Sequence, residues 1–220
     1  ERLRHRGPDE DGDYLSDDGR CAIGFRRLAV IDPLGSRQPM SSPDGLAVVA
    51  FNGEIYNFRA LREHLATAGM ALRTAGDTEV IPALYRRHGV EMLSRLEGMF
   101  AFAVHDVEAG RLLLARDRFG QRPLWYARLS DRVVFASEAK ALLTHPGVAA
   151  EADPRAVAFY LTLGYVPAPW SIWRHVRKLP AAHYLLIGKD CGEPVRYWSL
   201  PEETVAADPA RAVERTRELV

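Results

Sequence analysis

The chain has 220 residues, of which 47% are hydrophobic and 26% are charged, as in an ordinary soluble globular protein. Lys plus Arg and Asp plus Glu both number 29, so the formal net charge is zero. Without a basic excess, the composition favours neither a nucleic-acid nor an anionic-membrane partner. No apolar run approaches the ~20 residues of a membrane span. We therefore expect a globular, cytoplasmic protein.

The chain has two cysteines, Cys21 and Cys191, and nothing in it indicates an oxidising compartment. Cys21 lies in an apolar strand and is expected as a core thiol, whereas Cys191 is expected at a hairpin tip. The chain starts at Glu1 and ends at Val220 inside a helical pattern. We therefore expect a piece of a longer polypeptide.

The first half of the chain contains strand and helix patterns. Residues 21–32 predict a strand or strand pair, and residues 46–51 predict a short buried strand bounded by turn residues. Helical spacing of apolar residues follows over 57–69, with Gly69 as its stop, and again over 77–89. This part of the chain is therefore expected to alternate between sheet and helix.

The second half begins with two hairpin signals and a short helix, which we place at 99–106 with 111–117, 123–129 with 132–137, and 137–145. After a compositional shift near residue 145, we expect a helix at 153–165 and strands at 181–188 and 195–200. The order of elements predicts an α+β fold with antiparallel sheets and helices packed outside.

Asn52-Gly53 follows the apolar strand that we place at 46–51 and precedes a helix. An amide side chain at a strand end and a backbone N–H exposed beside glycine are two donors that could form an oxyanion hole. Taken alone, these two residues are more typical of a plain turn with Asn in a left-handed conformation.

Two charged residues could bind an amino acid by its ends. Arg27 lies in an otherwise apolar strand, and an inward-facing Arg needs a carboxylate, which a substrate could supply. Asp77 could accept hydrogen bonds from a substrate ammonium. Each also has a structural reading, because Arg27 could lie at an exposed strand start and Asp77 could cap the following helix.

Several site types have no motif in this chain. The sequence contains no HExxH or CxxC pattern that would suggest a metal site, and no glycine-rich phosphate loop. Neither cysteine has an obvious base beside it. We therefore expect no metal or cofactor in this part of the protein.

Seven segments, in this order, resemble the glutamine-hydrolysing domain of asparagine synthetase, a class II glutamine amidotransferase. They are HRGPDEDG, RRLAVID, FNGEIYNF, GDTEVI, GMFAFAVHD, ARDRFGQRPLWY and FASEAKALL. NGEIYN also separates this family from the phosphoribosyl-transferring and glucosamine-forming amidotransferases. The resemblance covers essentially the whole chain.

The resemblance implies a four-layer αββα sandwich of two antiparallel sheets, of the N-terminal-nucleophile type. In that family an N-terminal Cys attacks the carboxamide of glutamine, and its own α-amine, with a pKa near 8, acts as general base. A thioester forms, ammonia leaves, and water regenerates the enzyme.

The resemblance also assigns roles to residues of this chain. Asn52 and Gly53 become the oxyanion hole, Arg27 binds the α-carboxylate of glutamine, and Asp77 binds its α-ammonium. The residues expected to line the site beside them are Leu28, Ala29, Val30, Ile31 and Glu54.

The chain departs from the family pattern in two places. The family's nucleophile lies on a strand upstream of HRGPD, and Cys21 follows that motif, so it cannot take this role. Phe25 stands where the family commonly has His, two positions before the glutamine-binding Arg. We therefore expect this chain alone to be inactive and the effect of Phe25 to be local.

The resemblance implies a domain division and partners. Residues 1–200 would form the glutaminase domain, truncated at its N-terminus, and 201–220 a linker and the start of a helix leading into an absent synthetase domain. L-glutamine is the implied ligand, ATP and Mg²⁺ belong to the absent domain, and a homodimer is compatible with the family.

Two other readings stay open. In β-lactam synthetases, which resemble asparagine synthetases, the amidotransferase domain serves as a scaffold only, and loss of the N-terminal Cys would mark such a case. Alternatively, the glutaminase is retained and ammonia goes to a different carboxylate acceptor. The absent domain chooses the acceptor, and retention of Arg27, Asn52, Gly53 and Asp77 together favours an active glutaminase.

Overall fold

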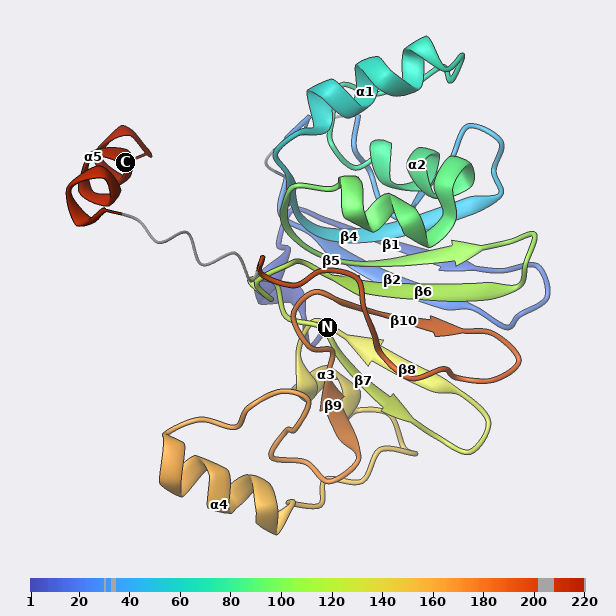
Figure 1. Cartoon of the computed structure of the whole chain (residues 1–220). Coiled ribbons are helices and arrows are strands. Elements are labelled where there is room, and N and C mark those ends of the chain that lie inside the picture. The colour runs from blue at the N-terminus through green and yellow to red at the C-terminus, as the bar shows by residue number, and fades with distance from the viewer. Residues whose placement is uncertain (30, 33–34, 202–207, 220) are drawn as a thin grey trace.

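The computed structural model describes residues 1–29, 31–32, 35–201 and 208–219, and Figure 1 shows their arrangement. Within these residues, no helix is long and apolar enough to cross a membrane. The expected linker beyond residue 200 falls mostly on 202–207, which lie outside the described residues.

The largest sheet is antiparallel and has six strands in the order β11-β10-β6-β5-β4-β3. Its long central strands, β4 and β5, pair along their whole length. The expected hairpin of β5 with β6 and the pairing of β10 with β11 are both confirmed. The bounds are β3 Met40–Ser41, β4 Ala47–Ile55, β5 Gly98–Asp106, β6 Arg111–Arg116, β10 His183–Ile187 and β11 Val195–Arg196.

Helices α1 (Phe58–Thr67) and α2 (Val80–His88) cover one face of this sheet, and the 3-10 turn η2 (Gly89–Arg95) follows α2 (Figure 1). Because side chains alternate along a strand, Phe51 of β4 and Phe102 of β5 face these helices in the main core. The intervening residues, including Asn52 of β4, therefore face the other side of the sheet.

A three-stranded antiparallel sheet, β8-β7-β9, packs on that other side. It comprises β7 (Trp125–Arg128), β8 (Val133–Ala136) and β9 (Val176–Lys178), and the short helix α3 (Ala139–Leu142) packs on its outer side. The hairpin of β7 and β8 was expected, whereas β9 was not. Helix α3 is shorter than the predicted 137–145.

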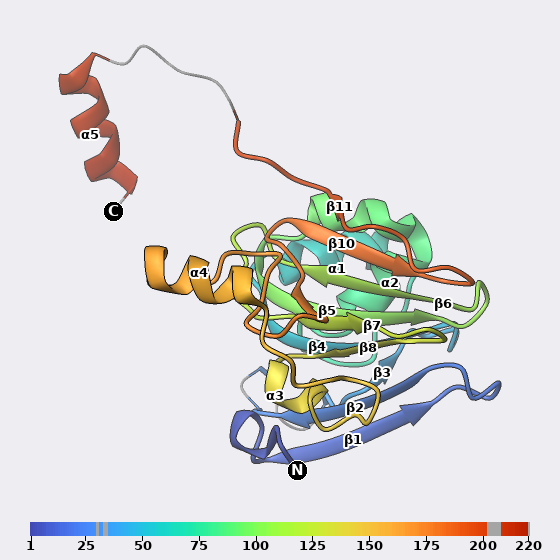
Figure 2. The same cartoon turned by 90° about the horizontal axis from the view of Figure 1, so that it is seen from below.

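A separate ribbon of two antiparallel strands lies beside this layer (Figure 2). It comprises β1 (Glu10–Leu15) and β2 (Ala22–Arg27) and follows the 3-10 turn η1 (Arg4–Arg6). The α+β class is confirmed, and the layers run helices, sheet, strands, helix. The second strand layer, however, is divided. Among the described residues no strand joins β2 to β8, so the structure has three sheets where two were expected.

The prediction that a strand stops at Phe51 is wrong, because β4 continues through Asn52-Gly53 to Ile55. Gly53 has φ +147°, and a Cβ placed on it would lie 2.0 Å from the Met99 carbonyl oxygen of β5. Glycine therefore lets two strands approach closely here. The Asn-Gly pair is an interior strand feature, and the expected corner does not exist.

Two further helices come late in the chain. Helix α4 (Pro154–Leu163) confirms the helix expected at 153–165, and α5 (Pro209–Leu219) follows the predicted amphipathic pattern. Figure 2 shows α4 standing off from the sheets. Gly69, with φ +81°, follows α1 as expected.

Candidate functional site

A cavity of about 470 Å³ lies between the ribbon, the six-stranded sheet and the end of β8. Its wall includes seven of the nine predicted site residues: Arg27, Leu28, Ile31, Asn52, Gly53, Glu54 and Asp77. Ala29 is outside this lining, and its N–H donates to the Asp9 carboxylate at 2.9 Å. Val30 lies outside the described residues. The fold thus brings together residues that are up to 50 positions apart in sequence.

Arg27 ends β2 and is only 4% exposed. Its Nη1 donates to Glu10 Oε2 at 2.9 Å, and its Nη2 donates to the Asp32 carbonyl at 3.0 Å. The sequence reading of an exposed strand start is therefore wrong. The guanidinium is a buried cation, fixed in direction, at the wall of the cavity.

Gly53 presents its backbone N–H on the open side of β4. The N–H groups of Phe51 and Ile55 point away from β5, because they donate to Gln38 Oε1 at 2.6 Å and Asp77 Oδ2 at 3.0 Å. Strand alternation gives the Gly53 N–H the same direction. Phe100, which stands opposite Gly53 on β5, supports this direction, because its N–H and carbonyl both bond to Asp117 on the β6 side.

Asn52 is the residue before Gly53, and its side chain lies on the cavity face of the sheet. An amide side chain and a backbone N–H on consecutive residues are therefore at one wall of the cavity. Such paired donors can stabilise negative charge on an oxygen held between them.

Asp77 is 4% exposed and lies in the segment before α2. Burial raises the pKa of this carboxyl, although the hydrogen bond from Ile55 N–H opposes the rise. Neither Asp77 nor Thr78 caps α2, because the N-cap position is Glu79. A buried carboxylate such as that of Asp77 can be stabilised by a cationic ligand.

The segment that carries Asp77 is held from three sides. Buried Glu79 accepts the Arg73 and Thr74 N–H groups at 2.7–2.9 Å, and these bonds lower its pKa despite burial. Asp32 Oδ2 accepts from Ala75 N–H at 3.0 Å, and Arg62 donates to the Gly76 carbonyl at 3.2 Å. The position of the Asp77 carboxylate is therefore fixed by the protein.

Sequence reasoning missed several lining residues. Ser36 is 2% exposed, and its hydroxyl has no hydrogen-bond partner among the residues that the structure describes. Arg122 contributes a guanidinium whose Nε is buried and has no partner within the described part of the chain. It follows Asp117, whose carboxylate accepts four backbone N–H groups and fixes this loop.

Neither cysteine is in the described lining of the cavity. Cys21 is buried as expected, and burial raises the pKa of its thiol to about 11. Cys191 precedes β11 in the β10–β11 connection, and burial also raises its pKa. Both thiols are therefore poor nucleophiles in this structure. Among the described residues, no three His, Cys, Asp or Glu side chains are grouped to hold a metal ion.

The chain belongs to the glutamine amidotransferase domain family, which matches residues 1–198. Its relatives include asparagine synthetase [glutamine-hydrolyzing] 1 of Bacillus subtilis (strain 168), 41% identical over 186 residues. Another is asparagine synthetase [glutamine-hydrolyzing] 3 of Arabidopsis thaliana, 45% identical over 142 residues. These matches cover 84% and 64% of this chain but only 29% and 24% of the relatives. The resemblance inferred from the motifs is confirmed.

Solved structures share the fold. Glutamine phosphoribosylpyrophosphate amidotransferase from B. subtilis superposes with a TM-score of 0.56 at 24% identity. A structure described as the allosteric regulatory enzyme of purine biosynthesis gives 0.57 at 25% identity. Each covers 82% of this chain and 35% of the other chain. The chain therefore has the fold of a glutamine amidotransferase domain.

Proposed function

We propose that the chain is the glutaminase domain of an ATP-dependent asparagine synthetase. It hydrolyses glutamine to glutamate and ammonia, and ammonia amidates aspartate in a C-terminal domain that uses ATP and Mg²⁺. The observation that most directly supports this proposal is that one cavity is lined by Arg27, Asn52, Gly53 and Asp77. The two free cysteines are compatible with a cytoplasmic setting.

Glutamine would be held by its two charged ends. Arg27 takes the α-carboxylate through charge-assisted hydrogen bonds, and Asp77 takes the α-ammonium. The buried Asp77 carboxylate supports this role, because a cationic partner would offset its desolvation. The carboxamide would then lie toward the Asn52-Gly53 donors.

The proposed reaction needs a thiol nucleophile, and the described lining of the cavity contains no cysteine. We place it on a strand preceding Glu1, which would enter between β2 and β8. Residues 23–27 of β2 line the cavity on one side, and Phe135 and Ala136 of β8 line it on the other. Among the described strands, β2 pairs only with β1 and β8 only with β7, so each offers an open edge. Such a strand would unite the divided layer.

In this mechanism the N-terminal thiol passes its proton to its own α-amine, and the sulfur attacks the carboxamide carbon. The resulting oxyanion is stabilised by the Asn52 side chain and the Gly53 N–H. The amine then returns the proton to the leaving nitrogen, ammonia departs, and a thioester remains. Water attacks the thioester, which releases glutamate and the free thiol.

The test compares two purified proteins. One is residues 1–220, and the other extends upstream to the natural N-terminus; glutamate release from glutamine is followed for both. We expect turnover only in the extended protein, with loss of turnover when its N-terminal Cys is replaced by Ser. Thiol-reagent-sensitive turnover by residues 1–220 would contradict the mechanism. An extended protein that binds glutamine but lacks turnover would indicate a scaffold.

A further inference from the structure

Helix α4 is largely apolar and is exposed to solvent. In its sequence, PRAVAFYLTL, the side chains with polar groups are Arg155, Tyr160 and Thr162, and only Ala156 is buried. Leu161 is 79% exposed, Leu163 is 50% exposed, and Tyr165 just beyond the helix is 60% exposed. A helix that is hydrophobic all round is normally buried.

The helix is firmly built despite its exposure. The Asp153 carboxylate accepts from the Arg155 N–H at 3.0 Å and caps its start. Gly164, in a left-handed conformation, ends it with an N–H to the Tyr160 carbonyl at 2.9 Å. The Arg155 guanidinium also lies 4.4 Å from the centre of the Trp170 ring. The apolar surface is therefore presented on a defined element.

The chemistry of this surface selects a protein partner. Ten residues are too few to cross a bilayer, which takes about 20. Exposed Tyr and Leu side chains on one element are typical of the centre of an interface, where aromatic side chains are enriched. The charged residues near α4 are paired within the chain, Arg155 with Asp153 and Arg174 with Glu151, so the apolar side chains dominate this surface.

We propose that α4, with Tyr165 and the neighbouring Ile172, is buried against the domain that follows residue 220 in the full polypeptide. The relatives are long enough for this, because the match spans only 29% of the B. subtilis protein. The proposal rests on the proposed function only in assigning this chain to such a longer polypeptide. It defines where the partner domain docks.

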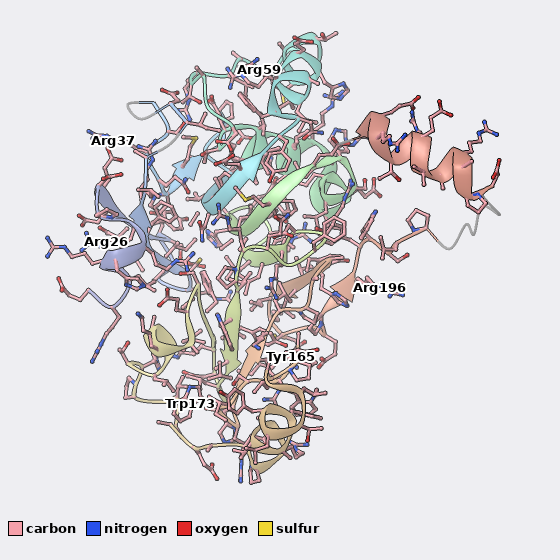
Figure 3. The ribbon with its side chains drawn as sticks, turned by 90° about the vertical axis from the view of Figure 1, so that its left-hand side faces the viewer. Arg26, Arg37, Arg59, Tyr165, Trp173 and Arg196 are labelled. Carbon is pink, nitrogen blue, oxygen red and sulfur yellow. The ribbon has the colours of Figure 1, made fainter. Side chains whose placement is uncertain are left out.

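The place where the chain leaves the body of the domain supports docking of the following domain on α4. Helix α4 and the segment that follows β11 leave the body on the same side of the molecule (Figures 1 and 2). Figure 3 looks onto this side, with Tyr165 near the lower centre and Arg196 of β11 above it. A domain tethered after β11 can therefore reach α4 without crossing the molecule.

The first test is photo-crosslinking in the full polypeptide, with a benzophenone amino acid placed at position 161. The matched control carries it at position 15, where Leu15 of β1 is 65% exposed. We expect position 161, and not position 15, to crosslink within one polypeptide to peptides beyond residue 220. Crosslinks between two polypeptides would show a second copy on α4 and overturn the proposal. Absence of crosslinks at position 161 would also overturn it.

The second test is hydrogen exchange of the α4 amides in the full polypeptide and its variants. Leu161→Asp should speed exchange at least about tenfold, whereas Leu15→Asp should leave it unchanged. Equal, fast exchange in the parent and both variants would show that α4 stays exposed. Neither readout depends on catalysis. Failure here with intact glutamine hydrolysis would refute the docking alone, and the reverse result would refute the glutaminase alone.

Discussion

Glu10 and Arg27 stand opposite each other in the β1–β2 ladder, and their side chains form an ion pair of 2.9 Å at the cavity wall. An arginine assigned to a substrate carboxylate is thus already in contact with a carboxylate of the protein. Its Nη2 is also directed by the Asp32 carbonyl. Glu10 therefore orients the guanidinium and also offsets part of its charge before any ligand arrives.

Replacing Arg27 tests substrate recognition in the full polypeptide, which includes the proposed synthetase domain. Arg27→Ala should raise KM for glutamine by about 10- to 100-fold, because a hydrogen bond to a charged group contributes roughly 1.5–3 kcal/mol. Ammonia-dependent synthesis should be nearly unchanged. Arg132→Ala is the control, because the exposed Arg132 side chain forms its ion pair with the neighbouring Asp131, away from the cavity lining. Unaltered glutamine kinetics in Arg27→Ala would show that Arg27 only supports β2.

The Glu10→Gln variant separates two effects of Glu10 on Arg27: the orientation of its guanidinium and the partial neutralisation of its charge. Glutamine keeps an acceptor for the Arg27 guanidinium but removes the competing negative charge, so KM for glutamine should fall. Glu10→Ala removes both, so KM should rise. Steady-state kinetics of the two variants decide the matter, and identical KM values would mean that the pair has no part in binding.

Gly53→Ala tests the close approach of β4 and β5. The new methyl group would meet the Met99 carbonyl at 2.0 Å, at a backbone angle that L-residues avoid. Gly45→Ala is the matched control, since Gly45 also has positive φ (+76°) but nothing within 4 Å of a new Cβ. Urea unfolding should show a loss of roughly 1–2 kcal/mol for Gly45→Ala and a clearly larger loss for Gly53→Ala. Equal losses would show that the strands separate freely.

Asp77 predicts a pH dependence of binding. Only its ionised form can pair with an ammonium, and burial raises its pKa above the ordinary 3.8. KM for glutamine should therefore rise as the pH falls through that raised pKa, and Asp77→Asn should flatten this dependence at a higher KM. A pH–KM profile that is the same in both proteins would remove Asp77 from the site.

The raised pKa of Asp77 also affects the stability of the fold. The pH dependence of stability has the opposite sign to that of glutamine binding. An acid whose pKa is raised by folding stabilises the fold when protonated, below pH 3.8, and this contribution is lost as the pH rises through the raised value. Asp77→Asn keeps an acceptor for the Ile55 N–H without a buried charge. Thermal unfolding at pH 7 should therefore show a higher Tm for Asp77→Asn.

For Glu138 we expect the converse pH dependence of stability. Burial opposes its ionisation, but hydrogen bonds from Lys140, His5 and Arg6 lower its pKa to about 2. Its contribution to stability is present above the ordinary value of 4.5 and is lost as the pH falls toward 2. Glu138→Gln should therefore cost about 1 kcal/mol at pH 7 and little at pH 2.5, measured by urea unfolding. An equal cost at both pH values would contradict the assignment.

The sequence was informative where a signal is local. Alternating apolar residues located β5 and β6, and the motif order located Arg27, Asn52, Gly53 and Asp77, which the fold gathers at one cavity. Both signals are contained within short segments. They therefore survive without knowledge of the tertiary structure.

Other features needed the pairing of distant strands. β4 continues past Phe51 because β5 pairs with it, although Asn52 and Gly53 are weak strand formers. β1 was missed because its acidic sequence, EDGDYL, lacks apolar alternation. The Glu10–Arg27 pair depends on the register of two strands, and no local pattern encodes that register.

Because the strand layer is divided, a bound glutamine could stabilise the domain by linking its two parts. Arg27 belongs to the two-stranded ribbon, whereas Asn52 and Gly53 belong to the six-stranded sheet, and no backbone ladder between described strands joins the two. A ligand held at both walls would tie them together, and its binding energy would add to the resistance of the domain to unfolding. At 100 times Kd this amounts to about 2.7 kcal/mol. Glutamine bound in this cavity would thus also make the domain more rigid.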